Sequence, residues 1–226
     1  MRVLAIDTAL EACSAAVLDT EQGVVASESV PMARGHAEAL MPLIAKVMGD
    51  AKLPFAELDR VAVTTGPGSF TGLRVGISAA RGIALASGKP AFGLTTLAAF
   101  AAPYIAGDDT IALAVAIDAR HAHVYLQVFG PGGRTLVAPR IASIRDAVRI
   151  AASSKTRIVG NAARAVAAAW PASEPPPVLI EQQKVPAIAW VARLGAVATG
   201  SPDTVKPLYL RAPDAQPQAA ARLPRR

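Results

Sequence analysis

Apolar residues in the first hundred positions follow two patterns, short strand-like runs and longer stretches with a helical period. Three strand-like runs with short polar connections begin the chain, which is typical of an antiparallel meander. From Gly35 the apolar positions instead recur on one face of a helix, and strands and helices then alternate. The pattern predicts strands at residues 2–8, 13–20, 23–30, 59–65 and 89–95, and helices at residues 35–48, 71–86 and 96–104.

The second half of the chain repeats this order with weaker periodicity. The pattern predicts strands at residues 110–118, 123–129, 134–138 and 157–159, and helices at residues 144–152, 161–170 and 186–199. Two successive β-β-β-α-β-α units predict a duplicated α/β protein with two lobes. We place the first lobe at residues 1–105 and a reduced second lobe at residues 106–211.

The composition is that of a globular protein with its own core. Hydrophobic residues make up 52% of the 226 positions and charged residues 18%, far from the balance of a disordered chain. Cys13 is the only cysteine, which excludes an intramolecular disulfide and a zinc site built from several cysteines. Because the sequence has neither a secretory leader nor an apolar run of about 18 residues, we expect a soluble, cytoplasmic protein with no membrane association.

The formal net charge is +6, and its distribution matters more than its size. Residues 211–226 hold four arginines and one aspartate, and therefore carry half of this charge. Their content of proline, alanine and glutamine predicts a disordered basic tail at residues 212–226. Charge alone leaves open an RNA-binding module, although a solvated terminus without a function is the simpler interpretation.

A glycine-rich turn, GPGSFTG at residues 66–72, joins a predicted strand to a predicted helix. A Walker loop requires a lysine after its last glycine, whereas Leu73 follows here. A Rossmann fingerprint requires a third glycine where this chain has Thr71. Both phosphate-loop templates therefore fail. What remains is a helix N-terminus, capped by Ser69 or Thr71, with free N–H groups for an anion.

Small residues recur every four positions along the helix that follows this turn. Gly72, Gly76, Ala80 and Ala84 share one face, and residues of this size let another backbone approach closely. The approaching backbone belongs either to the same fold or to another chain, and the sequence leaves both possibilities open.

Candidates for metal or nucleotide chemistry are few. His121 and His123 face the same way on a strand near Asp118, but the sequence offers no third or fourth ligand beside them. We therefore predict no metal site and no catalytic residue. Carboxylates end the first strands of the two halves, as in a metal–nucleotide site or as hairpin caps. The weak candidates for a cofactor site are Asp7, Thr8, Gly66, Gly68 and Asp118.

Several stretches together resemble the bacterial TsaB (YeaZ) family. They are AIDTALEACSAAVLD, RGHAEALMPLI, VTTGPGSFTGLRVGISAARGIA and GLTTLAAFA, followed by AIDARHAHVYLQVF and PLYLRAPDA. The resemblance spans nearly the whole chain apart from the arginine-rich tail. It implies a two-lobed actin/hexokinase-like (ASKHA) fold with ribonuclease H-like lobes, of which the second is reduced.

The resemblance also implies a non-catalytic subunit that binds and activates TsaD. TsaD transfers threonylcarbamoyl to the adenosine beside the anticodon of tRNAs that read A-starting codons, TsaC supplies threonylcarbamoyl-AMP, and the ATPase TsaE joins the complex. By this resemblance tRNA is bound only through the complex. We expect no cofactor on this chain alone, and the sequence leaves open whether ATP or ADP binds at the junction with TsaD. TsaD has an H-x-x-x-H metal pair on a first-lobe helix, where this chain has Ala80 and Ala84. No peptidase activity is expected, and the alternative is a residual ATPase or kinase of the same fold.

In this family the first-lobe helices form the partner surface, and they correspond to residues 35–48 and 71–86. The resemblance implies that this surface binds TsaD and allows a homodimer when TsaD is absent. We expect Leu40, Leu43, Val47 and Ile77 to be exposed on it. The full set of expected interface residues is His36, Leu40, Leu43, Ile44, Val47, Gly72, Arg74, Gly76, Ile77, Ala80 and Arg81.

Overall fold

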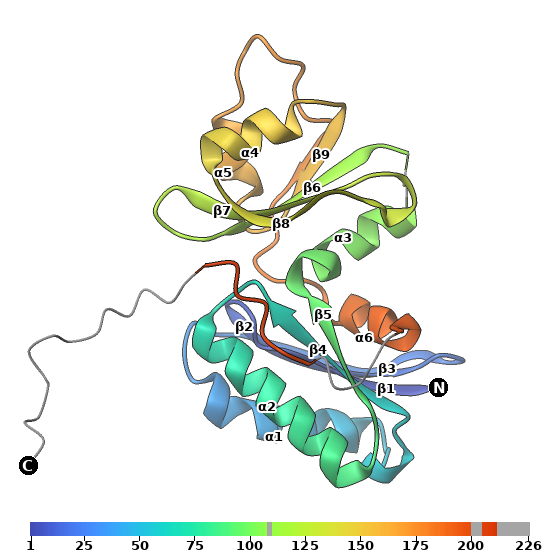
Figure 1. The fold of residues 1–226 in the computed structure, drawn as a ribbon. Coiled ribbons are helices and arrows are strands. Elements are labelled where there is room, and N and C mark those ends of the chain that lie inside the picture. Colours follow the sequence, from blue (N-terminus) through green and yellow to red (C-terminus); the bar gives the residue numbers. More distant parts are fainter. Residues whose placement is uncertain (108–109, 200–204, 212–226) are drawn as a thin grey trace, which may run out of the picture.

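Two five-stranded mixed sheets build the protein, and each sheet is formed by strands that follow one another along the chain. The computed structural model describes residues 1–107, 110–199 and 205–211. In Figure 1 the two sheets lie one above the other, each at the centre of a lobe. The prediction of a two-lobed α/β fold is therefore confirmed. The predicted tail at 212–226 lies outside the described residues.

The first sheet has the strand order β3-β2-β1-β4-β5. Its first three strands pair as an antiparallel meander, and β4 and β5 extend the sheet parallel to β1. The central strands are apolar on both faces because helices cover both sides of the sheet. The elements are β1 (Arg2–Asp7), β2 (Ala12–Asp19), β3 (Gly23–Pro31), α1 (His36–Asp50), β4 (Arg60–Gly66), α2 (Phe70–Ser87), β5 (Ala91–Thr95) and α3 (Thr96–Gly107).

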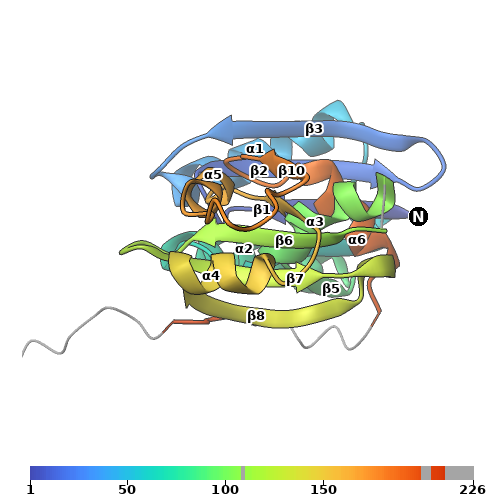
Figure 2. The same cartoon turned by 90° about the horizontal axis from the view of Figure 1, so that it is seen from above.

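The second sheet repeats this topology with the order β10-β9-β6-β7-β8. An antiparallel meander again leads into two parallel strands. The short β10 was not predicted, because three residues after a proline-rich loop are too few to show a period. The elements are β6 (Ala112–Asp118), β7 (His123–Phe129), β8 (Thr135–Ser143), α4 (Ile144–Ala151), β9 (Thr156–Val159), α5 (Ala163–Ala168), β10 (Leu179–Glu181) and α6 (Ile188–Val197). Viewed from above, the strands of both sheets run along a common direction (Figure 2).

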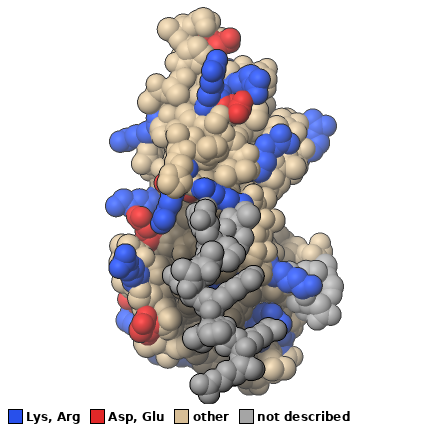
Figure 3. Space-filling view, turned by 60° about the vertical axis from the view of Figure 1, so that its left-hand side comes forward, with Lys and Arg blue, Asp and Glu red and all other residues tan. Residues whose placement is uncertain are grey.

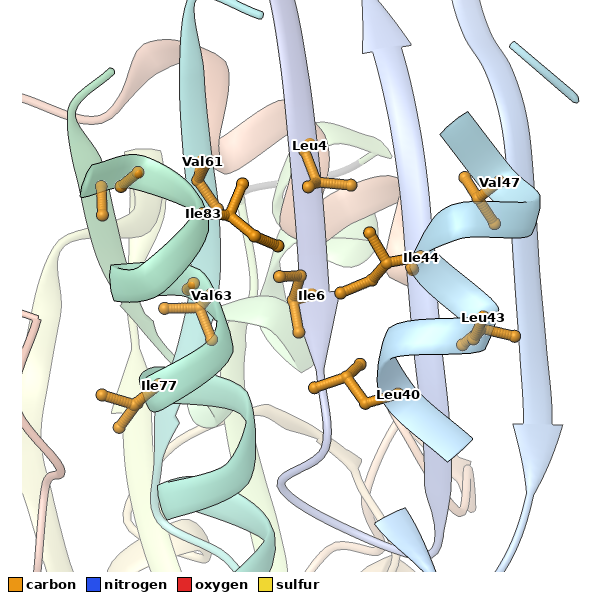
Figure 4. Packing of buried hydrophobic residues seen from close by; sticks show 14 of the residues in the cluster. Leu4, Ile6, Leu40, Leu43, Ile44, Val47, Val61, Val63, Ile77 and Ile83 are labelled. Carbon is orange, nitrogen blue, oxygen red and sulfur yellow. The ribbon is translucent and has the colours of Figure 1, made fainter. Parts of the chain in front are cut away.

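Helices α1 and α2 lie side by side against one face of the first sheet (Figure 1). Figure 4 shows Leu40 and Ile44 of α1 and Ile83 of α2 directed toward Leu4 and Ile6 of β1. Leu40, Leu43, Val47 and Ile77 are 1%, 7%, 1% and 4% exposed. The expectation that these four residues form an exposed surface is therefore wrong. The apolar stripe of an amphipathic helix packs on its own sheet here, as it does in most globular proteins.

Helix α6 packs on the opposite face of the first sheet, although the sequence placed it in the second lobe. Its Ile188, Val191 and Ala192 are buried against strand residues of the first lobe and against α3. The assignment of residues 106–211 to one lobe is corrected accordingly, because this helix covers a sheet face that α1 and α2 leave open. None of the helices in the described ranges is long and apolar enough to cross a membrane.

Candidate functional site

A cleft of about 730 Å³ lies between the two lobes. Loops that follow β1, β4 and β6 line it, so the cleft lies at the carboxyl ends of these strands. Open α/β sheets commonly bind ligands at this end. Of the weak cofactor candidates, Gly68 and Asp118 line the cleft, whereas Asp7 and Thr8 are each only 1% exposed.

Asp7 is buried in the first lobe, where neighbouring residues donate hydrogen bonds to its carboxylate. The Thr64 hydroxyl and the Ala9 backbone N–H both donate to its Oδ1. Burial raises the pKa of Asp7, and these two hydrogen bonds offset only part of that effect. The carboxyl group therefore closes the end of β1 rather than presenting a charge to the cleft.

The glycine-rich turn packs against the chain's own first loop. A Cβ atom on Gly68 would lie 2.3 Å from the carbonyl oxygen of Ala9, and one on Gly72 would lie 2.1 Å from that of Thr8. The Ser69 N–H donates to the Ala9 oxygen at 2.7 Å, and Ser69 Oγ caps α2 by accepting from the Gly72 N–H at 3.2 Å. The first loop, residues 8–9, therefore packs closely against one side of this turn and engages the Ser69 amide, while residues 67–71 line the cleft on the other side.

The same packing identifies the backbone that approaches the small residues of α2. A Cβ atom on Gly76 would lie 2.4 Å from Thr8 Oγ1, and Ala80 is fully buried in the core of the first lobe. The placement of Gly72, Gly76 and Ala80 on a partner surface is therefore wrong. These residues are small because the first loop and the sheet of the same chain lie against them.

Of the other four expected interface residues, two are buried in the first lobe and two are exposed. His36 and Ile44 are buried, and His36 Nε2 lies 3.0 Å from the carbonyl oxygen of Leu10. Arg74 and Arg81 are exposed on α2. The residues that are exposed on these helices were not predicted as interface residues, because they lie off the apolar stripe and four of them are small. These four are Ala45, Gly49, Ser78 and Gly82. Met41 is 50% exposed on α1 and Leu85 is 86% exposed on α2.

On the second lobe, Asp118 begins a tight hairpin at the rim of the cleft. Its carboxylate accepts the Arg120 N–H at 2.9 Å, and its own N–H donates to Asn161 Oδ1 at 2.7 Å. His123 Nδ1 lies 2.7 Å from the carbonyl oxygen of His121, so this ring is engaged within the turn. Across residues 1–107, 110–199 and 205–211, no three His, Cys, Asp or Glu side chains gather as metal ligands would.

The C-terminal segment PLYLR also enters the cleft, which the sequence did not predict. Four consecutive residues, 208–211, line it together with Phe70. The tyrosine of this segment, Tyr209, stacks on Phe70 with ring centroids 5.2 Å apart. The motif itself was visible in the sequence, but no local signal places a C-terminal segment between two lobes.

Duplicated lobes around a cleft define the class of two-lobed actin/hexokinase-like proteins. The fold agrees with a polyphosphate/ATP-glucomannokinase from Arthrobacter, with a TM-score of 0.50, 13% identity and coverage of 87% of this chain and 98% of that one. YeaZ from Pseudomonas aeruginosa is more similar, with a TM-score of 0.79, 26% identity and coverage of 92% and 99%.

A family model described as TsaD, tRNA N6-adenosine threonylcarbamoyltransferase, matches residues 14–197. An uncharacterized protein from Mycobacterium tuberculosis is 36% identical over 96% of this chain and 95% of its own length. The tRNA threonylcarbamoyladenosine biosynthesis protein TsaB of Escherichia coli is 36% identical over 55% of this chain and 53% of its own length. The chain belongs to the TsaB (YeaZ) family.

Proposed function

We propose that this protein acts in the biosynthesis of threonylcarbamoyladenosine in tRNA as the non-catalytic partner that binds and activates TsaD. Support for the pathway comes from the name of the Escherichia coli relative and from the TsaD family model that covers most of the chain. In this proposal TsaC supplies threonylcarbamoyl-AMP, TsaE joins the complex, and the transfer itself takes place on TsaD.

The packing of the glycine-rich turn is the main observation in support of a role without catalysis for this chain. The Ser69 N–H, which a phosphate-binding loop would offer to its ligand, donates instead to the carbonyl oxygen of Ala9, and Gly68 and Gly72 pack closely against residues 8–9. Asp7, at the end of the first strand, is buried and already hydrogen-bonded. A transferase or kinase would need this part of the cleft open to substrate.

We place the partner surface on the outer sides of α1 and α2, and define the α1–α2 outer surface as Met41, Ala45, Gly49, Ser78, Gly82 and Leu85. All six residues are exposed. A Cβ atom at Gly49 or Gly82 would meet nothing within 4 Å, so a helix from another chain can approach closely there. The high exposure of Leu85 and Met41 supports this location, because large exposed apolar side chains often lie in interfaces.

In this proposal tRNA is the substrate of the complex, and the surface charge of this chain is compatible with a nearby polyanion. Lys and Arg side chains predominate over acidic ones on the face of the molecule drawn in Figure 3, on both lobes. Such a face favours an anionic partner through a contribution that salt weakens. In this proposal tRNA is bound by the whole complex and modified on TsaD, and this face adds only a long-range electrostatic attraction.

The volume of the interlobe cleft favours a second candidate, a residual ATPase or kinase. About 730 Å³ lies within the range of small-molecule sites, and Asp118 lies at its rim. Calorimetry of the isolated chain with Mg-ATP discriminates between the two functions. Micromolar binding favours the enzyme, and absence of heat favours the partner subunit.

Reconstitution tests the main proposal directly. TsaD from the same organism is incubated with threonylcarbamoyl-AMP, tRNA and TsaE, with and without this chain, and threonylcarbamoyladenosine is measured by mass spectrometry. We expect product only when TsaD is present, and at least about a tenfold higher rate when this chain is added, equivalent to about 1.4 kcal/mol of barrier. Product formed by this chain without TsaD contradicts the proposal.

A further inference from the structure

The C-terminal strap, residues 205–211, is anchored at the end of β4 in the first lobe. Val205 is 3% exposed within the core of that lobe. The Leu208 N–H donates to the carbonyl oxygen of Thr65 at 2.8 Å. A Cβ atom on Gly66 would lie 3.1 Å from the Leu208 oxygen, so the strap passes directly over the glycine-rich turn.

Side chains of α2 hold the middle of the strap. The ring of Tyr209 stacks on Phe70 at an interplanar angle of 30°. The guanidinium group of Arg74 lies 3.8 Å from the centre of the Phe70 ring, and Arg74 Nε donates to the Tyr209 hydroxyl at 3.3 Å. Two stretches far apart in sequence, GSFTGLR and PLYLR, therefore meet at one packed contact.

The end of the strap reaches the second lobe. Arg211 Nη1 donates to the carbonyl oxygen of Ala119 at 2.9 Å. This oxygen precedes a turn in which Arg120, His121 and Ala122 all have left-handed backbone angles, with φ of 63°, 51° and 57°. Such conformations are unfavourable for residues with side chains and persist when surrounding contacts enforce them. Arg211 supplies one of these contacts from the other side of the cleft.

We propose that residues 205–211 occupy the interlobe cleft as a bound ligand would, and that their contacts with both lobes hold the lobes at a fixed angle. Two covalent crossings, from α3 to β6 and from β10 to α6, also join the lobes (Figure 1). The strap adds a contact that touches both sides of the cleft, as a bound ligand does in a two-lobed protein. A molecule that opens or fills this cleft therefore competes with the Tyr209 and Arg211 contacts. This inference does not rest on the proposed function.

Distances between spin labels test the proposal on the isolated full-length chain. Labels are placed at Ser78→Cys on α2 and Arg145→Cys on α4, two exposed positions in different lobes. The only native cysteine is fully buried, and burial raises the pKa of its thiol to about 11, so it does not compete for the label. We expect a broader distribution of label distances when Arg211→Ala is introduced, and the same for Tyr209→Ala.

Hydrogen exchange of the second-lobe hairpin provides an independent measurement. The N–H groups of Ala119 and His123 are hydrogen-bonded within this hairpin. In Arg211→Ala we expect them to exchange about fivefold faster, the factor that corresponds to one lost hydrogen bond of about 1 kcal/mol. Arg140→Ala, at an exposed position of β8, is the matched control. Unchanged distances and exchange in both strap variants, or equal changes in the control, overturn the proposal, provided that circular dichroism shows all chains folded.

Discussion

Thr8 contacts Gly72 through both its side chain and its backbone. Its hydroxyl donates a 2.7 Å hydrogen bond to the Gly72 carbonyl oxygen, and its own carbonyl oxygen lies 2.1 Å from where a Gly72 Cβ would begin. We therefore expect Gly72→Ala to lower the free energy of unfolding by about 1–3 kcal/mol, the usual effect of overpacking. Gly76→Leu should prevent folding, because its side chain would start 2.4 Å from Thr8 Oγ1.

Urea denaturation measures these effects, and Gly82→Ala is the control on the same helix. A Cβ atom at Gly82 meets nothing within 4 Å, so this substitution should raise the free energy of unfolding by about 0.5–1 kcal/mol. A folded Gly76→Leu chain that has lost only its affinity for TsaD would restore the interface role that we have rejected for this glycine.

Asp7 should make the protein less stable as pH rises. Burial raises the pKa of its carboxyl group in the folded state, so the folded chain retains a proton that the unfolded chain releases. The stability from this group is complete below the unfolded pKa and is lost as pH rises through the folded pKa. We expect Asp7→Asn to gain stability relative to the wild type as pH rises above the ordinary aspartate pKa of about 4, measured by urea denaturation.

Asp19 provides a control of opposite sign for this measurement. A hydrogen bond from the Glu21 N–H lowers the pKa of the Asp19 carboxyl group, and the stability from this group is lost as pH falls. Its contribution grows as pH rises through the range below the ordinary aspartate pKa of about 4. Asp19→Asn should therefore lose stability relative to the wild type over that lower range and change little above it. If both variants shift in the same direction, a cause other than these two carboxyl groups controls the pH dependence.

Arg60 fastens α6 to the first lobe. Its Nη1 donates to the carbonyl oxygens of Gly195, Ala196 and Ala198 at 3.1, 3.2 and 3.0 Å, at the end of the helix. Arg60→Met keeps much of the apolar stem but leaves these oxygens without their charged donor. We expect the free energy of unfolding to fall by about 1.5–3 kcal/mol, as for other hydrogen bonds to charged groups.

Thermal and urea denaturation of Arg164→Met provide the comparison for Arg60→Met. Arg164 is exposed on α5 of the second lobe, so its replacement should change stability by no more than about 0.5 kcal/mol. Equal losses in the two variants would argue against a specific role of Arg60 in holding α6.

Leu85 tests the partner surface, because it is the most exposed large apolar residue among those described. Leu85→Asp should leave the melting temperature unchanged, since the side chain contributes little to the core. On the α1–α2 outer surface it should weaken TsaD binding at least about tenfold, measured by calorimetry or surface plasmon resonance. Leu136→Asp, at a 45% exposed position of β8, should leave binding unchanged. Equal affinity of wild type and Leu85→Asp would exclude this surface.

Much of the fold could be predicted from the sequence, because the period of apolar residues is a local property. The helices at 36–50 and 70–87 and nearly all strands agree with the pattern within a few residues. The candidate site was harder to predict. Gly68 and Asp118 do line the cleft, but the buried environment of Asp7 and the contribution of Tyr209 depend on segments that meet only in the folded chain.

The sequence by itself determined the two repeated units, the apolar face of each helix, a cap at Ser69 or Thr71, and the family. Only the tertiary structure decided what each face contacts. Leu40 and Ile77 have the same helical period whether they cover a sheet or bind a partner, and Gly72 is equally small in either case. The structure places all three against other residues of the first lobe. It also places α6 on the sheet face opposite α1 and α2, and the C-terminal strap over the glycine-rich turn. The physical reason is that periodicity records which residues share a face, whereas burial depends on which distant segments of the chain pack against it.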